Sequence, residues 1–144
     1  MNLLTHIVAA EEDEVVAIGE SLRPTDEWSG IERRGIDAAK IVMLHTLLTN
    51  DDFDVACALY EPLYIGSEGA VVLRLADSVT EKLAELDEEA LEHVAEELAA
   101  TAEFEIEGWP EDDIQSMIMD LADLAQLASA QEQALFVWMH PLLT

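Results

Sequence analysis

Two side chains in one apolar stretch, Asp37 and His45, have the types and the spacing that general acid–base catalysis uses. The stretch runs from Gly35 to Thr49 and is apolar nearly all round a helix, which is typical of a helix inside a domain. Eight residues at about 100° each bring His45 back to within about 80° of Asp37, so this carboxylate would orient the imidazole as a base. No nucleophile motif accompanies the pair. A structural histidine in the core, with Asp37 as a helix cap, is the competing interpretation.

A second group of potential ligands lies further along the chain, where acidic residues and one histidine recur at helical spacing. Its members are Glu89, Glu92, His93, Glu96 and Glu97. The spacing resembles half of a di-metal carboxylate site, which takes a Glu-x-x-His motif from each of two helices. The chain contains no such pair of motifs, so we interpret the group as a solvated helix face. We expect neither a metal nor a cofactor.

The charge of the chain is its most unusual property. Thirty-two acidic residues face six basic ones, for a net charge of −26. All six cations lie at or before Lys82, and residues 83–144 carry sixteen acids with no Lys or Arg. Such a surface repels phosphate backbones and anionic membranes and attracts basic partners. Three explanations stay open, namely adaptation to a saline cytoplasm, a docking face for a basic protein, and mimicry of nucleic acid.

We predict that a docking face is built mainly from residues 83–123. Two tryptophans in connectors with Gly or Pro neighbours would flank a groove or an interface, where Trp is enriched. The candidate binding residues are Glu88, Glu89, Glu92, Glu96, Asp112, Asp113, Trp109 and Trp28.

Length and composition predict a single domain over residues 1–144, because a chain of this size buries a sufficient core without a disulfide or a metal. The single cysteine, Cys57, has the neighbours Ala56, Ala58 and Leu59, which indicate a buried and unreactive thiol. The start of the chain lacks the basic region of a signal peptide, and no apolar run approaches the roughly 18–20 residues of a membrane span. We therefore expect a soluble, cytoplasmic protein.

Hydrophobic periodicity predicts a helix-rich α+β domain with a small sheet, and an all-α fold is the alternative. The expected strands are 2–9, 70–75 and 134–139, that is, N-terminal, middle and C-terminal. The expected helices are 11–22, 35–49, 52–60, a pair within 78–98, and 111–130. Residues 25–35, 63–69 and 103–109 are expected to be connectors.

The order of these elements and several short motifs resemble the bacterial YfbM-like family, whose function is unknown. The resemblance rests on Ile36-Asp37, on the Leu-His-Thr-Leu-Leu-Thr run at 44–49, and on the helical pair within 78–98. It also rests on Ile106 and Pro110 before a long helix and an apolar final strand. In the family an Asp-Lys pair directly precedes an aromatic, whereas here Asp37 and Lys40 are separated. The resemblance implies an α+β fold over nearly the whole chain and no activity, and family members are suspected of being accessory or immunity-type proteins.

Together these observations favour a non-enzymatic protein-binding or immunity-type module that docks a basic partner. They disfavour direct binding to nucleic acid or to a membrane. The alternatives are a small enzyme that uses His45 with a carboxylate, or an acidic mimic of nucleic acid.

Overall fold

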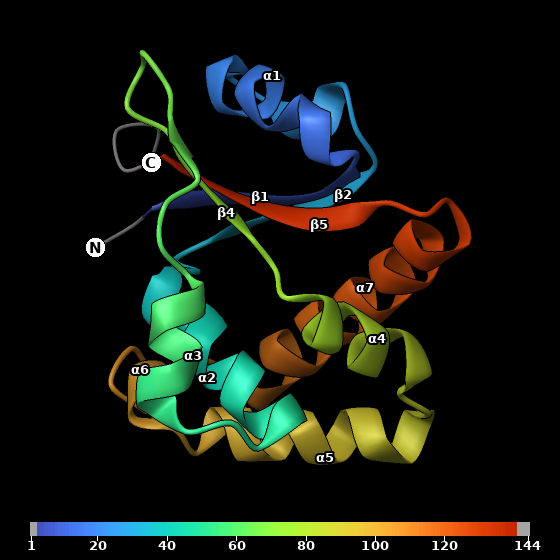
Figure 1. Cartoon of the computed structure of the whole chain (residues 1–144). Coiled ribbons are helices and arrows are strands. Elements are labelled where there is room, and N and C mark those ends of the chain that lie inside the picture. The colour runs from blue at the N-terminus through green and yellow to red at the C-terminus, as the bar shows by residue number, and fades with distance from the viewer. Residues whose placement is uncertain (1–2, 141–144) are drawn as a thin grey trace.

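A five-stranded antiparallel sheet with helices on both faces organises the chain (Figure 1). The computed structural model describes residues 3–140. The strands are β1 (Leu4–Ala10), β2 (Gly30–Arg34), β3 (Tyr64–Ile65), β4 (Val71–Arg74) and β5 (Ala134–His140), in the spatial order β2-β1-β5-β4-β3. The helix-rich α+β fold is therefore confirmed, and so are strands at the start, middle and end of the chain.

The two central strands, β1 and β5, are buried along their entire length. They pair antiparallel from Leu4 opposite His140 to Ala10 opposite Ala134. Because successive side chains of a strand point to opposite faces, Ile7 and Val137 enter one core while Val8 and Phe136 enter another. Burial on both faces explains why these segments are nearly continuous apolar runs.

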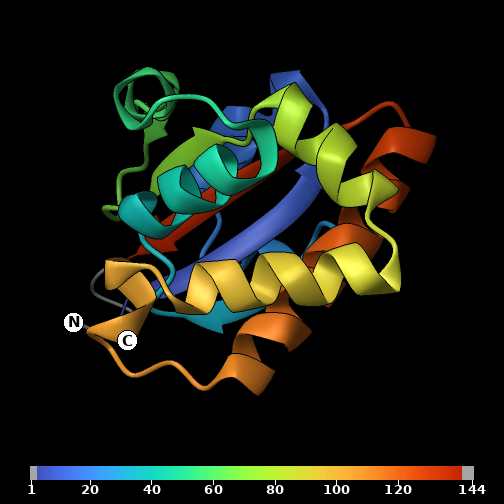
Figure 2. The ribbon, with the colours of Figure 1, turned by 90° about the horizontal axis from the view of Figure 1, so that it is seen from below.

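One face of the sheet is covered by a thick helical layer, seen from below in Figure 2. It comprises α2 (Ala38–Thr49), α3 (Phe53–Leu59), α4 (Asp77–Glu85), α5 (Glu88–Ala99), α6 (Ala102–Glu105) and α7 (Glu111–Ala130). The predicted bounds of α7 are confirmed, and its Ile114, Met117, Ile118 and Leu121 are buried at helical spacing. Their side chains form much of the larger of the two cores, which we call the large core.

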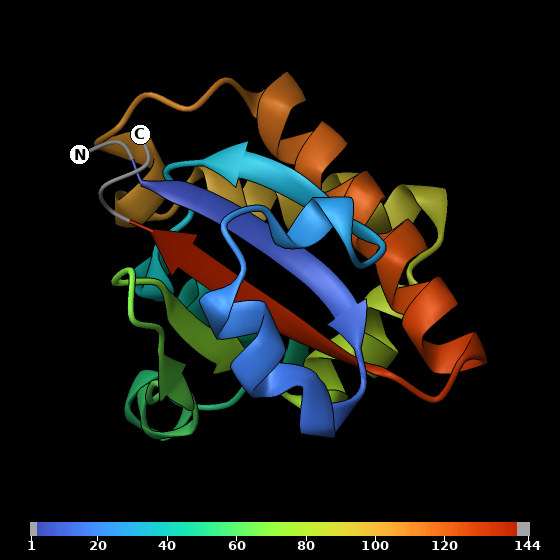
Figure 3. The same cartoon turned by 90° about the horizontal axis from the view of Figure 1, so that it is seen from above.

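The other face of the sheet is covered by less chain, as the view from above shows (Figure 3). The cover consists of the 3-10 turns η1 (Glu12–Glu14) and η2 (Pro24–Asp26) and the short helix α1 (Val15–Glu20). Under it lies what we call the small core, which includes Val8, Ile18, Phe136 and Trp138. Gly19 allows the close approach of this cover, since a Cβ atom there would stand 2.2 Å from the ring of Tyr64.

Three expected connectors contain regular structure. Strand β2 lies within 25–35, β3 within 63–69, and α6 overlaps 103–109. Strand β2 is an edge strand whose residues Gly30, Glu32 and Arg34 are exposed, so the apolar alternation that marks a strand is missing from it. Its pairing with β1 creates it, with Leu4 opposite Arg34 and Val8 opposite Gly30.

The prediction of a buried Cys57 is wrong, because its side chain is exposed. Helix α3 buries only Ala56, and its other side chains are exposed. Within residues 3–140, no helix combines the length and the apolarity that crossing a bilayer requires.

Candidate functional site

The carboxylates predicted to form a docking face gather on α5 and on the start of α7. On α5, Leu91, Val94, Ala95 and Leu98 point into the large core. The opposite side of this helix therefore presents Glu88, Glu89, Glu92 and Glu96 to solvent. The side chain of Asp87 accepts a hydrogen bond from the backbone N–H of Ala90 at 2.8 Å and caps the helix.

Helix α7, which packs against α5, carries further acids in its first turn. Its first turn consists of Glu111, Asp112 and Asp113, all exposed, at the positive end of the helix dipole. Helices α5 and α7 pack against each other, and both are visible from below (Figure 2). We call the set Glu88, Glu89, Glu92, Glu96, Asp112 and Asp113 the acidic face.

Most cations of the chain lie elsewhere and already have acidic partners. Arg23 binds Glu32 at 2.7 Å, and Arg74 binds both Glu12 and Asp77 at 2.8 Å. Arg33 pairs with Asp120, and Lys40 pairs with Glu107 at 2.5 Å. Helix α5 and the first turn of α7 contain no Lys or Arg. The carboxylates of the acidic face therefore have no Lys or Arg partner on their own elements.

The acidic face is open and slightly hollowed. A hollow of about 490 Å³ is lined on α5 by Asp87, Glu89, Glu92, His93 and Glu96. The imidazole of His93 lies 2.8 Å from a carboxylate oxygen of Glu97, so this histidine belongs to the same charged surface. The arrangement is a solvated face rather than a di-metal site enclosed by helices.

Trp109 lies beside the acidic face, whereas Trp28 does not. The ring of Trp109 packs edge-on against Phe104 at 5.4 Å, and it lines a hollow of about 290 Å³ together with Asp113. Trp28 packs against the small core, and its indole N–H donates to Glu14 at 2.9 Å. The two tryptophans belong to opposite faces of the sheet and do not flank one groove.

His45 does not pair with Asp37, and of the two interpretations of Asp37 the helix cap is confirmed. Asp37 caps α2 by accepting a hydrogen bond from the backbone N–H of Lys40 at 3.0 Å. The carboxylate partner of His45 is Asp51, whose Oδ2 lies 2.7 Å from Nε2 of the ring. Asp51 is brought there because Asn50 adopts a left-handed conformation, with φ of 63°, and ends α2.

His45 is fully buried, and both of its ring nitrogens have protein partners. The hydroxyl of Tyr60 accepts the backbone N–H of Ala76 at 3.2 Å and also forms a hydrogen bond with Nδ1 of His45 at 2.8 Å. The hydrogen bond with His45 lowers the pKa of Asp51, while burial raises the pKa of Tyr60. This network joins α2 to α3 and to the start of α4, which is a structural role.

A buried cation was missed by sequence reasoning. The Lys40 side chain is only 2% exposed, lies 5.6 Å over the ring of Phe104 and binds Glu107. That hydrogen bond lowers the pKa of Glu107. The signal available was a lone lysine within an apolar helix, which must either reach solvent or find a carboxylate inside.

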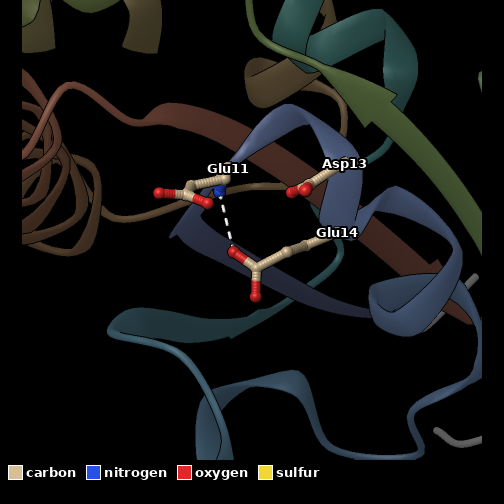
Figure 4. A group of neighbouring side chains, drawn as sticks. All are labelled: Glu11, Asp13 and Glu14. Carbon is tan, nitrogen blue, oxygen red and sulfur yellow. Dashed lines mark hydrogen bonds between the residues drawn. The ribbon is translucent and has the colours of Figure 1, made fainter.

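One cluster has the composition of a metal site. Carboxylate oxygens of Glu11, Asp13 and Glu14 lie within 4.8 Å of one another (Figure 4). Glu14 is already engaged by protein donors, since one oxygen accepts the N–H of Glu11 and the other accepts the indole N–H of Trp28, each at 2.9 Å. These bonds lower the pKa of Glu14 and explain the cluster as the capped start of η1.

Comparison of the chain with family models, with curated proteins and with solved structures found no match.

Proposed function

We propose that this protein is a non-enzymatic binding module whose acidic face docks a basic protein. One observation carries the proposal: six exposed carboxylates gather on two adjacent helices, and those elements contain no Lys or Arg. A partner with a complementary basic patch would be drawn to this face by its field and would be oriented by it. A basic toxin that the protein neutralises in the cytoplasm is a partner of this kind, and on this proposal the module is of the immunity type.

The uneven placement of charge favours docking over adaptation to salt. Adaptation would distribute unpaired acids over every surface. Here Arg23 and Arg74 neutralise acids around the small core, and Arg33 and Lys40 neutralise others beside β2 and α2. The six carboxylates of the acidic face, by contrast, have no Lys or Arg on their own helices, although other exposed acids such as Asp13, Glu27 and Glu132 lie elsewhere on the surface.

Apolar side chains stand next to the acidic face. Ile106 follows α6 and is 84% exposed, and Trp109 is half-buried three residues later. A large apolar side chain at the rim of a charged surface supplies the short-range contact that long-range attraction lacks. These two residues are accordingly part of the proposed docking surface.

The alternative of a small enzyme has less support. A general base needs one nitrogen free to reach a substrate, and both nitrogens of His45 are occupied. Membership of the YfbM-like family remains a proposal. The run at 44–49 that carries the resemblance falls on α2 and supplies core residues such as Leu44 and Leu48.

A pull-down from the native host tests the proposed function. The immobilised protein should retain a basic partner at low salt and release it at high salt, because screening removes the attraction. Once that partner is purified, its association rate constant should fall steeply with salt, as measured by stopped flow. Recovery of no basic protein at low salt would contradict the proposal.

Matched variants separate the acidic face from total charge. One variant carries Gln at Glu88, Glu89, Glu92 and Glu96. A second removes four exposed acids elsewhere, through Asp13→Asn, Glu27→Gln, Asp123→Asn and Glu132→Gln. Both variants lose four negative charges. Because only the first loses them from the acidic face, only the first should lose the partner. An equal loss in both would show that net charge, rather than this face, attracts it.

A further inference from the structure

Exposed apolar side chains gather at one edge of the molecule. Nine large apolar residues within 3–140 are exposed, and five of them lie in the short segment between positions 53 and 65. They are Phe53, Val55, Leu59, Leu63 and Ile65, with exposed fractions from 48% to 64%. We call these five residues the apolar patch. Single exposed apolar residues are ordinary, but a cluster on a monomer marks an interaction site.

Two adjacent elements build the apolar patch. Val55 and Leu59 lie one turn apart on α3. The chain then enters β3, where Tyr64 pairs with Val72 of the small core. Since side chains alternate along a strand, Leu63 and Ile65 point to the opposite side, which is the side of the helical layer and of α3. Figure 1 places both at the edge of the sheet beyond β4, with α3 below the sheet and the tip of the β3–β4 hairpin above it.

Helix α3 is weakly supported by the rest of the molecule. It has seven residues, and only Ala56 among them is buried. A helix this short is unstable in water unless packing supports it. Its exposed surface is mostly apolar, with Val55, Ala58 and Leu59, and Asp54 is its one charged side chain. A partner that covers α3 would supply the missing contacts.

The rim of the apolar patch has a single sign of charge. The exposed charged residues near its members in the sequence include Asp52, Asp54, Glu61 and Glu68. The sequence has no Lys or Arg between Lys40 and Arg74. An apolar centre with a polar rim is the usual anatomy of a protein–protein interface. A second copy of this chain would bring two acidic rims and two charges of −26 together, so charge complementarity selects a partner with a basic rim.

We propose that the apolar patch docks a basic protein through an apolar centre ringed by Lys and Arg. This inference rests on the proposed function, because it takes the partner to be basic. It adds that the partner must also present apolar side chains, and it places them against α3 and β3. The partner therefore makes two contacts, one electrostatic at the acidic face and one apolar at this edge.

Cys57 provides a direct readout of occupancy. It is the only cysteine of the chain, it is exposed, and it lies on α3 one turn from Phe53. Its reaction with a thiol reagent such as N-ethylmaleimide reports whether α3 is covered.

Two synthetic peptides of equal charge serve as probes, an amphipathic Leu/Lys helix and an oligolysine interrupted by Gly. The Leu/Lys peptide at about ten times its dissociation constant should slow labelling about tenfold, because about nine in ten sites are then covered. Oligolysine should leave the labelling rate unchanged.

A pair of matched variants locates the contact. Val55→Gln combined with Leu59→Gln should abolish the protection of Cys57 by the Leu/Lys peptide. Val16→Gln combined with Leu22→Gln changes the same residue types at nearly the same exposure, 55% for each, and should retain it. Circular dichroism of each variant alone confirms that the fold is intact. Binding of the Leu/Lys peptide without protection of Cys57 would overturn the proposal.

Two further outcomes separate this inference from its competitors. Sedimentation velocity that shows a dimer in the unmodified chain and a monomer in the Val55→Gln, Leu59→Gln variant would overturn it in favour of self-association. The variant with Gln at Glu88, Glu89, Glu92 and Glu96 should bind oligolysine more weakly but keep the protection of Cys57. If that variant binds oligolysine as the unmodified chain does, the acidic face fails while the apolar patch stands.

Discussion

The two cores on either side of the sheet differ in how well their buried polar groups are hydrogen-bonded. In the large core, both ring nitrogens of His45 are bonded and the ammonium of Lys40 has a carboxylate partner. In the small core, Nε1 of Trp138 has no hydrogen-bond partner among residues 3–140, and the only group near Nε2 of His6 there is a Glu32 carboxylate oxygen at 3.1 Å. Nδ1 of His6 accepts a hydrogen bond from the backbone N–H of Thr25 at 3.2 Å.

The difference follows from how much chain covers each face. Six helices build the large core, and their ends bring Tyr60, Asp51 and Glu107 to the buried groups. Within residues 3–140, only η1, α1 and η2 cover the small core, so fewer donors and acceptors reach it. A buried polar group without a partner costs free energy, and the small core is therefore expected to be the less tolerant of the two.

Trp138 tests the small core with the largest expected effect. Trp138→Ala should lower the free energy of unfolding by about 3–5 kcal/mol, because it leaves a cavity where a fully buried ring packs beside Phe136. Urea denaturation measures the loss. Trp138→Phe is the control and should cost clearly less, since it fills most of the space and removes the unbonded N–H. Equal losses would show that the indole N–H is bonded after all.

Replacing Lys40 and Glu107 one at a time tests the large core, because the two losses of stability should differ. Glu107→Gln should lower the free energy of unfolding by about 1–3 kcal/mol, because it leaves a buried ammonium with only Asp37 at 3.7 Å. Lys40→Met should cost less, since it removes the buried charge and leaves a Glu107 side chain that is 40% exposed to water. Urea denaturation of both variants checks this order. The reverse order would mean that the pair itself, rather than its completeness, stabilises the fold.

Tyr60→Phe tests whether the His45 network is structural. The variant removes the hydroxyl that bonds Nδ1 of His45 and accepts the Ala76 N–H, so the free energy of unfolding should fall by about 1–2 kcal/mol. Thermal denaturation measures the effect. Tyr64→Phe is the matched control, because its hydroxyl donates to Glu20 at the surface, and it should change stability little. A neutral Tyr60→Phe would indicate that the network serves another purpose.

The pH dependence of stability tests His6. Burial lowers the pKa of His6 below its ordinary value of 6.5, and Arg23 adds to this while Glu32 and Asp26 oppose it. Below pH 6.5 the unfolded chain therefore binds a proton that the folded chain refuses, so stability falls as the pH falls. This is the smallest of the four effects.

The variant His6→Asn keeps an acceptor near the Thr25 N–H and cannot titrate. Urea midpoints measured between pH 7 and pH 5 should fall less for this variant than for the unmodified chain. Identical slopes would show that His6 binds its proton equally in the folded and unfolded states.

Sequence patterns predicted those elements whose own hydrophobic pattern matches their burial in the fold. Helix α7 has a long apolar stripe and Pro110 before it, so its bounds were predicted correctly. Strands β1 and β5 are apolar because both of their faces are covered. By contrast, β2 and β3 exist because a neighbouring strand pairs with them, and their own residues carry little strand signal.

The residues of the candidate site likewise differ in whether the sequence could predict their placement. The outward carboxylates of α5 follow from helical period alone, and the structure places them as expected. Trp28 and Trp109 have similar neighbours in sequence yet pack against different cores. The exposure of Cys57 and of the apolar patch was also unpredictable, since α3 is apolar enough to be buried and the fold leaves it at an edge.

The sequence by itself determined the helix-rich α+β class, the net charge and the acid-rich stretch after Lys82, because period and composition are local properties. Only the tertiary structure decided that His45 meets Asp51 rather than Asp37. Only it decided that Lys40 is buried against Glu107, and that the apolar patch stays uncovered. These outcomes depend on which elements the sheet brings together, and contacts between residues far apart in the chain leave no periodic signal within either segment.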